Sequence, residues 1–193
     1  MLKRLFIVVL VAVAMSFGAL VRAAEMFKVD PVHSAVVFRI GHFNIGQIYG
    51  RFNLTEQAGK FVIDQEKPEN STFEIVIEAG NIDTANQKRD DHLRSPDFFN
   101  VKQFPQITFK STSVKSAGDN VYEVTGDLTL HGVTRPITLI VNKLGEGKDP
   151  MGNYRAGLAV EFSVKRSDYG MDFMLQGIAD EVHLMIGIEG TKQ

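Results

Sequence analysis

Apolar and polar residues alternate along most of the chain after residue 23. The segment STFEIVIEA at 71–79 places Phe73, Ile75 and Ile77 on one face and glutamates on the other. Strict alternation of this kind predicts a strand with one buried face and one solvated face. The same pattern is clear at 121–132, 156–165 and 181–190, and it is weaker at 35–43, 48–56, 59–65, 106–115 and 134–144.

Clusters of Gly, Asp, Asn and Pro separate these segments, for example at 116–120, 145–150 and 149–153. They predict about eight or nine strands with short connections and no strand–helix–strand rhythm. The apolar faces of such strands must meet, which either a sandwich or a closed up-and-down barrel achieves. An eight-stranded barrel holds either a packed interior or one small ligand. The residues alone favour the packed interior.

One segment has a helical pattern, IDTANQKRDDHLR at 82–94, and we expect its helix to begin near Asp83. Thr84 and Gln87 have the spacing of a capping box, and the Ser95-Pro96 pair predicts the end of the helix. Ser95 is also placed to cap a second short turn.

The charged residues of this segment raise the question of catalysis. Successive helical residues point about 100° apart, so Asp90, Asp91 and His92 do not converge on one atom. We expect Asp90 and Arg94 to form a surface ion pair instead. The segment is predicted to cover one end of the barrel, using the apolar side chains Leu93, Phe98, Phe99 and Phe104.

The N-terminus predicts a cleaved secretory signal peptide over residues 1–23. Lys3 and Arg4 precede an uncharged apolar run from 5 to 20, and small residues end at Ala23. The run is shorter than the roughly 20 residues that span a bilayer, although a retained anchor is the alternative. Residues 24–193 then form a single exported domain, and we expect it in the periplasm.

Charge and composition narrow the function further. Removing residues 1–23 takes away three basic residues, so 18 basic residues remain against 23 acidic ones, a net charge of −5. An acidic surface argues against nucleic acid as a partner, because that binding rests on Lys and Arg. The chain has no cysteine, so the exported domain is expected to be stable without disulfides.

Signals for metal binding and catalysis are weak. No two of the five histidines stand at a close ligand spacing, and no metal site or cofactor is predicted. Alternation places His131 and His183 on the solvated side of their strands. There is no phosphate-binding glycine loop and no nucleophile elbow. The fourteen phenylalanines are consistent either with core packing or with a tubular apolar pocket.

Five segments match a known family in the same order along the chain. They are DPVHSAVVFRIGHF (30–43), YGRF (49–52), RDDHLRSPDFFNVKQFPQITFKSTSV (89–114), GDLTLHGVTRPITL (126–139) and KRSDYGM (165–171). These segments resemble the YceI-like family of periplasmic polyisoprenoid-binding proteins. The resemblance implies an all-β fold, an extended antiparallel eight-stranded lipocalin-like β-barrel with one short helical segment. One departure is 44–47, where many relatives carry aromatic residues.

The resemblance also implies a long apolar pocket that holds an isoprenoid, such as a polyprenyl or quinone-type lipid. The candidate ligand-binding residues lie on the apolar faces of the strands or in the loop after 165. They are Phe38, Ile40, Phe73, Ile75, Phe109, Leu128, Leu130, Leu158, Val160, Phe162, Tyr169, Met171 and Leu184. Tyr169, Met171, Phe173 and Met174 could gate entry, and Arg51, Arg89, Arg94 and Arg166 could meet an anionic head group.

The favoured interpretation is a binding and carrier protein that performs no catalysis and uses no metal. Two alternatives remain open. One is a lipid-processing hydrolase in which folding brings His33, Asp91 and His92 together, and the other is a ligand-free structural barrel with a solid core. A homodimer formed through an exposed strand is also open, although no feature of the sequence marks such a strand.

Overall fold

The computed structural model describes residues 24–193, so the expected signal peptide lies outside the described residues. These residues form eleven strands, one α-helix and three short 3-10 helices. The strands are β1 (Glu25–Val29), β2 (Ala35–His42), β3 (Gly46–Phe52), β4 (Gly59–Ile63), β5 (Thr72–Glu78), β6 (Ile82–Asp83), β7 (Gln106–Gly118), β8 (Val121–Leu130), β9 (Val133–Lys148), β10 (Tyr154–Lys165) and β11 (Ile178–Lys192). The helices are η1 (Pro68–Asn70), η2 (Ala79–Asn81), α1 (Gln87–Arg94) and η3 (Arg166–Tyr169).

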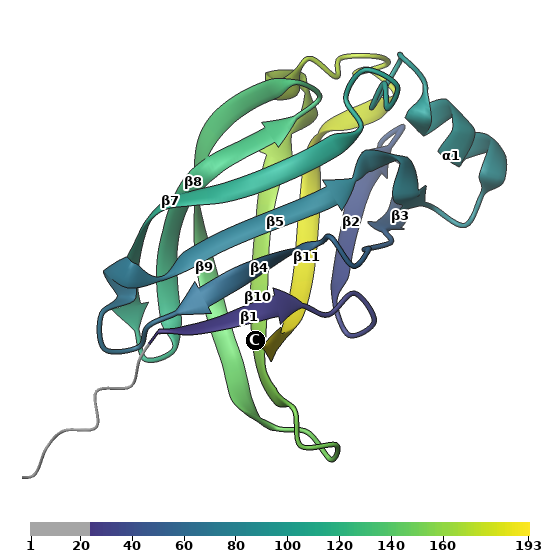
Figure 1. The fold of residues 1–193 in the computed structure, drawn as a ribbon. Helices are drawn as coiled ribbons and strands as arrows, with labels where there is room; N and C mark the ends of the chain where they lie inside the picture. The colour runs from purple at the N-terminus through teal and green to yellow at the C-terminus, as the bar shows by residue number, and fades with distance from the viewer. Residues whose placement is uncertain (1–23) are drawn as a thin grey trace, which may run out of the picture.

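Eight of the strands close into one antiparallel barrel, as expected. Their order is β1-β4-β5-β7-β8-β9-β10-β11, and β1 closes the ring by pairing with β11. β2 continues along β11 beyond β1 and carries β3 and β6, so these three strands extend one side of the barrel (Figure 1). β1 and β6, of five and two residues, are the two strands that the alternation did not predict.

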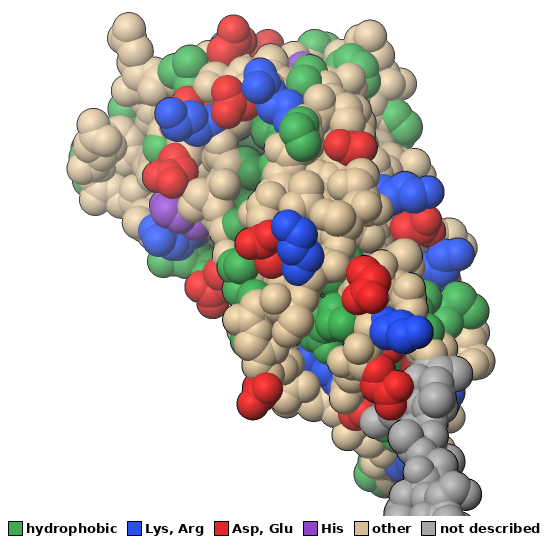
Figure 2. All heavy atoms as spheres, turned by 90° about the vertical axis from the view of Figure 1, so that its left-hand side faces the viewer, with side chains coloured by type: hydrophobic (Ala, Val, Ile, Leu, Met, Phe, Trp, Pro, Cys, Tyr) green, Lys and Arg blue, Asp and Glu red, His purple; other side chains and the backbone are tan. Residues whose placement is uncertain are grey.

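The polar residues of the alternating pattern lie on the outer surface of the barrel. Strand pairs carry exposed ion pairs on their outer face, such as Lys110 with Glu74 at 3.2 Å and Lys115 with Glu123 at 3.8 Å. The face shown in Figure 2 mixes basic and acidic side chains, with hydrophobic ones scattered between them. Within residues 24–193, no helix is both long enough and apolar enough to cross a membrane.

The helix is shorter than predicted, and its cap is different. α1 begins after Asn86, whose side chain accepts a hydrogen bond from the Arg89 amide. The capping box of Thr84 and Gln87 was therefore wrong, because Thr84 is buried and bonds Asp90 instead. The predicted turn at 95 is present, with the Ser95 hydroxyl accepting a hydrogen bond from the Asp97 amide.

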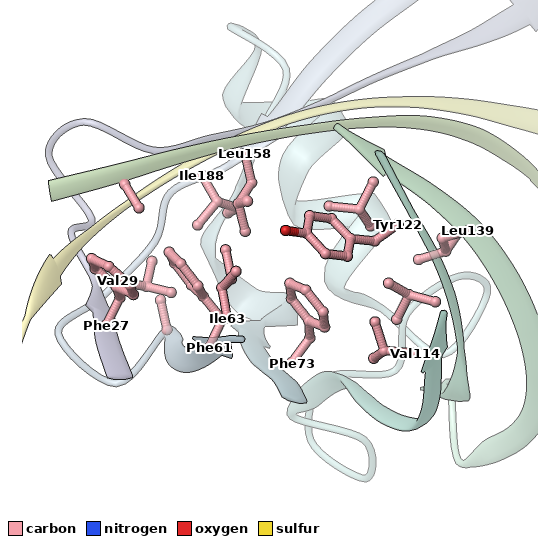
Figure 3. Close-up of a cluster of buried hydrophobic side chains, with 14 residues drawn as sticks. Phe27, Val29, Phe61, Ile63, Phe73, Val114, Tyr122, Leu139, Leu158 and Ile188 are labelled. Atoms are coloured by element: carbon pink, nitrogen blue, oxygen red, sulfur yellow. The ribbon is translucent and has the colours of Figure 1, made fainter. Parts of the chain in front are cut away.

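Aromatic rings fill the end of the barrel near β1. Phe27 stacks on Phe61 with ring centroids 5.1 Å apart, and Phe61 stacks on Phe73 at 6.4 Å. These rings lie against the backbone of Gly190, where an added Cβ would be 2.6 Å from the Phe61 ring. The surrounding strands contribute further buried side chains (Figure 3). This cluster closes one end of the barrel interior, and we call it the aromatic floor.

An ion-pair cluster reinforces the closure between β1, β10 and β11. The Arg155 guanidinium contacts Asp30 at 2.6 Å, Glu189 at 2.7 Å and Asp149 at 2.7 Å. Burial alone would raise the pKa of Asp30, but hydrogen bonds from Arg155 and His33 lower it far below its usual range. Hydrogen bonds from Asn153 and Arg155 lower the pKa of Asp149 to about 2.

We predict that Arg155→Met destabilises the protein in a pH-dependent way. A carboxyl group whose pKa is lowered by folding stabilises the protein above its unfolded pKa of about 4 and loses that contribution as the pH falls through the folded value. The difference in unfolding free energy between wild type and variant should therefore be largest at neutral pH and shrink below about pH 4. Urea unfolding at a series of pH values measures it.

The control is Lys28→Met, which removes an exposed pair with Glu56. Its effect should be small at every pH, because exposed ion pairs contribute little. A constant difference between wild type and Arg155→Met down to acidic pH would contradict the role assigned to the cluster.

Candidate functional site

The barrel encloses a cavity of about 610 Å³ above its aromatic floor. The wall is made almost entirely of apolar side chains from the strands, with α1 and the segment after it on one side. The packed interior that the residues alone favoured was therefore wrong. The pattern failed here because the same apolar side chains can either fill a barrel or line it.

Twelve of the thirteen predicted ligand-binding residues line this cavity. The exception is Tyr169, which is 2% exposed and packs in a separate cluster with Leu128, Leu130 and Met171. The alternation would also have found many of the wall residues that were missed, such as Val36 and Ile186. Contact between these residues and a ligand remains a prediction.

The mouth of the cavity lies beside α1. Four cavity-lining residues are exposed to solvent: Asn86, Lys88 and His92 around α1, and Met174 in the loop before β11. His42, at the end of β2, also lines the cavity. The opening is therefore bordered by α1, the β2–β3 turn and the loop 171–177, at the end of the barrel away from the floor (Figure 1).

The charged residues of α1 hold the helix in place. Asp90 is buried and accepts hydrogen bonds from the amide and the hydroxyl of Thr84. Arg89 donates to the Thr84 hydroxyl at 2.7 Å and to the Thr84 carbonyl at 2.6 Å. The predicted ion pair between Asp90 and Arg94 was wrong, because Arg94 instead pairs with Asp91 at 3.0 Å. These residues anchor one border of the mouth.

The four arginines suggested for an anionic head group all have hydrogen-bond or ion-pair partners within the protein. Arg166 is buried and donates to the carbonyl oxygens of Met171, Ile178 and Ala179. These three bonds fix the loop that borders the mouth. The remaining two guanidinium groups are also engaged. Arg51 pairs with Asp83, and Arg94 donates to the carbonyl oxygens of Gly80 and Ile82.

Lys88 is the mouth residue that the sequence analysis missed. It is exposed and lines the cavity. Its side-chain ammonium has no hydrogen bond or ion pair with any other residue in the described part of the chain. Its position on the first turn of α1, beside Arg89, could have suggested it only if the direction of the helix had been known.

The hydrolase hypothesis required three residues to converge, and the structure separates them. His33 contacts Asp30 at 2.8 Å, beside the ion-pair cluster at the floor end. His92 contacts Asp97 at 2.8 Å and packs edge-on against Phe98 and Phe173, and Asp91 points toward Arg94. The side chains of Asp91 and His92 have different partners although the two residues are adjacent in α1, and His33 lies with Asp30. The three side chains do not converge, so the hypothesis was wrong in its geometry.

Two other arrangements of side chains contain a histidine. Asp30, His33 and Glu189 could offer ligand atoms to a metal ion, but the Arg155 guanidinium already supplies the positive charge to both carboxylates. His131 was expected on the solvated side of a strand, which was wrong. It lies in the β8–β9 turn, where its ring packs against Phe104 and donates through Nδ1 to the Tyr169 carbonyl.

Comparison with known proteins agrees with this architecture. A family model described as the YceI-like domain matches residues 27–190. The chain belongs to the YceI-like family. A UPF0312 protein of Pectobacterium atrosepticum is 39% identical over 191 residues, covering 99% of this chain and 98% of that protein.

Two solved structures share the fold of this YceI-like protein. The crystal structure of Burkholderia cenocepacia BcnA has a TM-score of 0.75 at 23% identity, covering 83% of this chain and 98% of that one. A polyisoprenoid binding domain from Saccharophagus degradans, implicated in plant cell wall breakdown, has a TM-score of 0.66 at 16% identity, covering 89% of this chain and 100% of that one. At these identities the two structures establish the fold.

We predict that Asp90→Ala loosens α1 while the barrel stays folded. The substitution leaves a buried amide and hydroxyl of Thr84 without their acceptor, which should cost about 1–3 kcal/mol. Amide hydrogen exchange should therefore become faster in α1 and stay unchanged in the barrel strands. Asp91→Ala is the matched control, since its side chain is exposed and its ion pair contributes little. Equal exchange rates of the α1 amides in the two variants would show that Asp90 does not anchor the helix.

Proposed function

We propose that this YceI-like protein binds one long apolar lipid, of the polyprenyl or quinone-tail type, inside its barrel and does not convert it chemically. The observation that carries the proposal is the cavity of about 610 Å³ with an almost wholly apolar wall. The related fold described as a polyisoprenoid binding domain supports it. We further propose that the protein acts in the periplasm after residues 1–23 are removed, as the basic start and apolar run suggest.

The volume suits the tail of such a lipid. Pockets of roughly 300–1,000 Å³ enclose most of a small organic ligand, and the cavity of about 610 Å³ lies within this range. A longer chain would extend through the mouth beside α1.

The energetics favour a lipid over water as the occupant. An ordered water needs two to four polar partners, and the apolar wall offers few. Each buried CH2 group of a lipid contributes roughly 0.8 kcal/mol, and the ordering of the chain offsets part of this gain. The tail is held by the apolar surface that it buries and by the shape of the cavity. The wall therefore selects for an apolar chain and does not select strongly for its head group.

The lining residues support binding without catalysis. No Asp, Glu, Ser or Tyr lines the cavity in the described part of the chain. Thr84 lines the cavity beside α1, and its hydroxyl is already hydrogen-bonded to Asp90 and Arg89. Nucleophilic catalysis needs a side chain with an adjacent base facing the substrate. The Thr84–Asp90 pair has this form, but we assign it to anchoring α1.

We predict that Leu128→Glu and Phe162→Glu each abolish lipid retention, because both side chains line the cavity and a carboxylate there is costly to bury against an apolar chain. Lipid carried through purification is measured by solvent extraction and mass spectrometry, and circular dichroism checks that each variant is folded. Ile140→Glu is the control, since Ile140 is 48% exposed and does not line the cavity.

Full retention in both folded glutamate variants would contradict the proposal. A second variant remains informative if the charged side chains prevent folding. Val160→Phe keeps the wall apolar and occupies part of the cavity, so it should lower the amount of lipid retained or shorten the longest chain bound. An unchanged lipid content and chain length in Val160→Phe would place the ligand elsewhere.

A further inference from the structure

Exposed hydrophobic side chains gather at the mouth of the cavity. In the β2–β3 turn, Ile45 is 90% exposed and Phe43 is 50% exposed. In the loop before β11, Met174 is 45% exposed and Leu175 is 40% exposed. We call these four residues the apolar rim. Ile45 does not line the cavity.

The two halves of the apolar rim form one surface. The Phe43 amide donates to the Gly177 carbonyl at 2.7 Å. The side chains of Phe43 and Met174 both lie against Gly177, 2.8 Å and 3.2 Å from where its Cβ would be. The turn and the loop are therefore packed together, and Phe43 and Met174 are neighbours. Contiguous apolar surface of this kind marks an interaction site, whereas scattered exposed residues do not.

The apolar rim is continuous with the cavity. Met174 belongs to the rim and also lines the cavity, and His42, which lines the cavity, packs edge-on against Phe43. An apolar chain leaving the cavity at this point would pass directly along the rim. A partner that receives or supplies such a chain therefore has to meet the rim first.

Two residues of the apolar rim have an unusual backbone conformation. Phe43 and Met174 adopt positive φ values of 50° and 53°, which are uncommon for bulky residues. Glycine or asparagine would adopt this conformation more easily. The turn and the loop thus present large apolar side chains at positions where small or polar residues would be favoured by the backbone.

The charges near the mouth suit an anionic surface. Lys88 has no partner in the described chain, and Arg39 on β2 contacts only the uncharged amide of Gln47, at 3.2 Å. The loop 171–177 carries one charge, on the acidic Asp172, so Lys88 supplies the positive charge at the mouth. The anionic head groups of a phospholipid surface would give Lys88 an acceptor while the acyl chains receive the apolar rim.

We propose that the apolar rim docks on the surface of a phospholipid bilayer that contains anionic lipid. The rim side chains enter the boundary between head groups and acyl chains, and Lys88 meets the phosphates. The mouth then faces the bilayer, so an apolar chain moves between bilayer and cavity without crossing bulk water. This docking step goes beyond the proposed function, which concerns only the cavity.

The first test is flotation with vesicles of phosphatidylethanolamine and phosphatidylglycerol. The wild-type protein should bind them. The double variant Ile45→Asp with Leu175→Asp should bind at least about tenfold more weakly, because burying one such side chain changes an equilibrium by about this factor. The matched control is Leu144→Asp with Met151→Asp, two residues that are 72% and 79% exposed at the β9–β10 hairpin, far from the mouth (Figure 1). It should bind like the wild type.

The second test uses the absence of tryptophan from the chain. Ile45→Trp introduces a single reporter into the apolar rim, and its emission should shift to the blue when the vesicles are added. Met151→Trp places the same reporter on the opposite end and should show no shift. Both positions are highly exposed, so neither substitution threatens the fold.

Three results would overturn the proposal: equal vesicle binding by the rim variant and the wild type, an unshifted Ile45→Trp emission, or a wild-type dimer that is lost in the rim variant while vesicles are not bound. The last result would make the rim a contact between two copies of the chain. Neither Ile45 nor Leu175 lines the cavity, so the rim variant should keep its lipid. Docking and lipid binding can therefore fail separately.

Discussion

The closure of eight strands into one ring is the constraint on which the rest of the structure depends. Pairing between β1 and β11 closes the ring and turns the inward side chains toward a common interior. The interior of a ring of this size can be filled by side chains or can hold one small ligand. Phe27, Phe61 and Phe73 fill it at one end, and the aliphatic wall above them leaves the cavity of about 610 Å³.

Polar residues around the cavity hold its surroundings in place. Arg155 gathers three carboxylates at the seam of the barrel. Asp90 and Arg89 tie α1 to Thr84, and Arg166 ties down the loop on the other side of the mouth. The charged segment RDDH, which at first suggests catalysis, is thus part of the frame around an opening. Lys88 is the one cation of this frame that no other residue of the described chain engages.

Much of this fold could be predicted, because the two-residue period of a half-buried strand is a local property of the sequence. The period identified the long strands and placed residues such as Leu128 and Phe162 on the inner face. The short strands β1 and β6 were missed because their pairing depends on distant strands. The partner of Asp90 was missed for a different reason. Thr84 lies only six residues before Asp90, but their contact depends on the conformation of the non-helical residues before α1.

The alternation of apolar and polar residues could not predict the cavity. Leu, Ile, Val and Phe on an inner face are compatible with either a solid or a hollow barrel, and the difference depends on the radius of the ring and on side-chain packing. Only the resemblance to a family favoured the hollow barrel. The candidate ligand-binding residues followed from that choice, and all of them line the cavity except Tyr169, which is buried in η3 and packs in a separate cluster.

The most direct test of the central claim is native mass spectrometry of the protein purified from the periplasm, combined with solvent extraction of the same sample. The account predicts the mass of a chain lacking residues 1–23 plus one discrete excess mass, which extraction releases as a single class of isoprenoid lipid. A bare protein mass that stays unchanged after incubation with prenyl chains and quinones would contradict it.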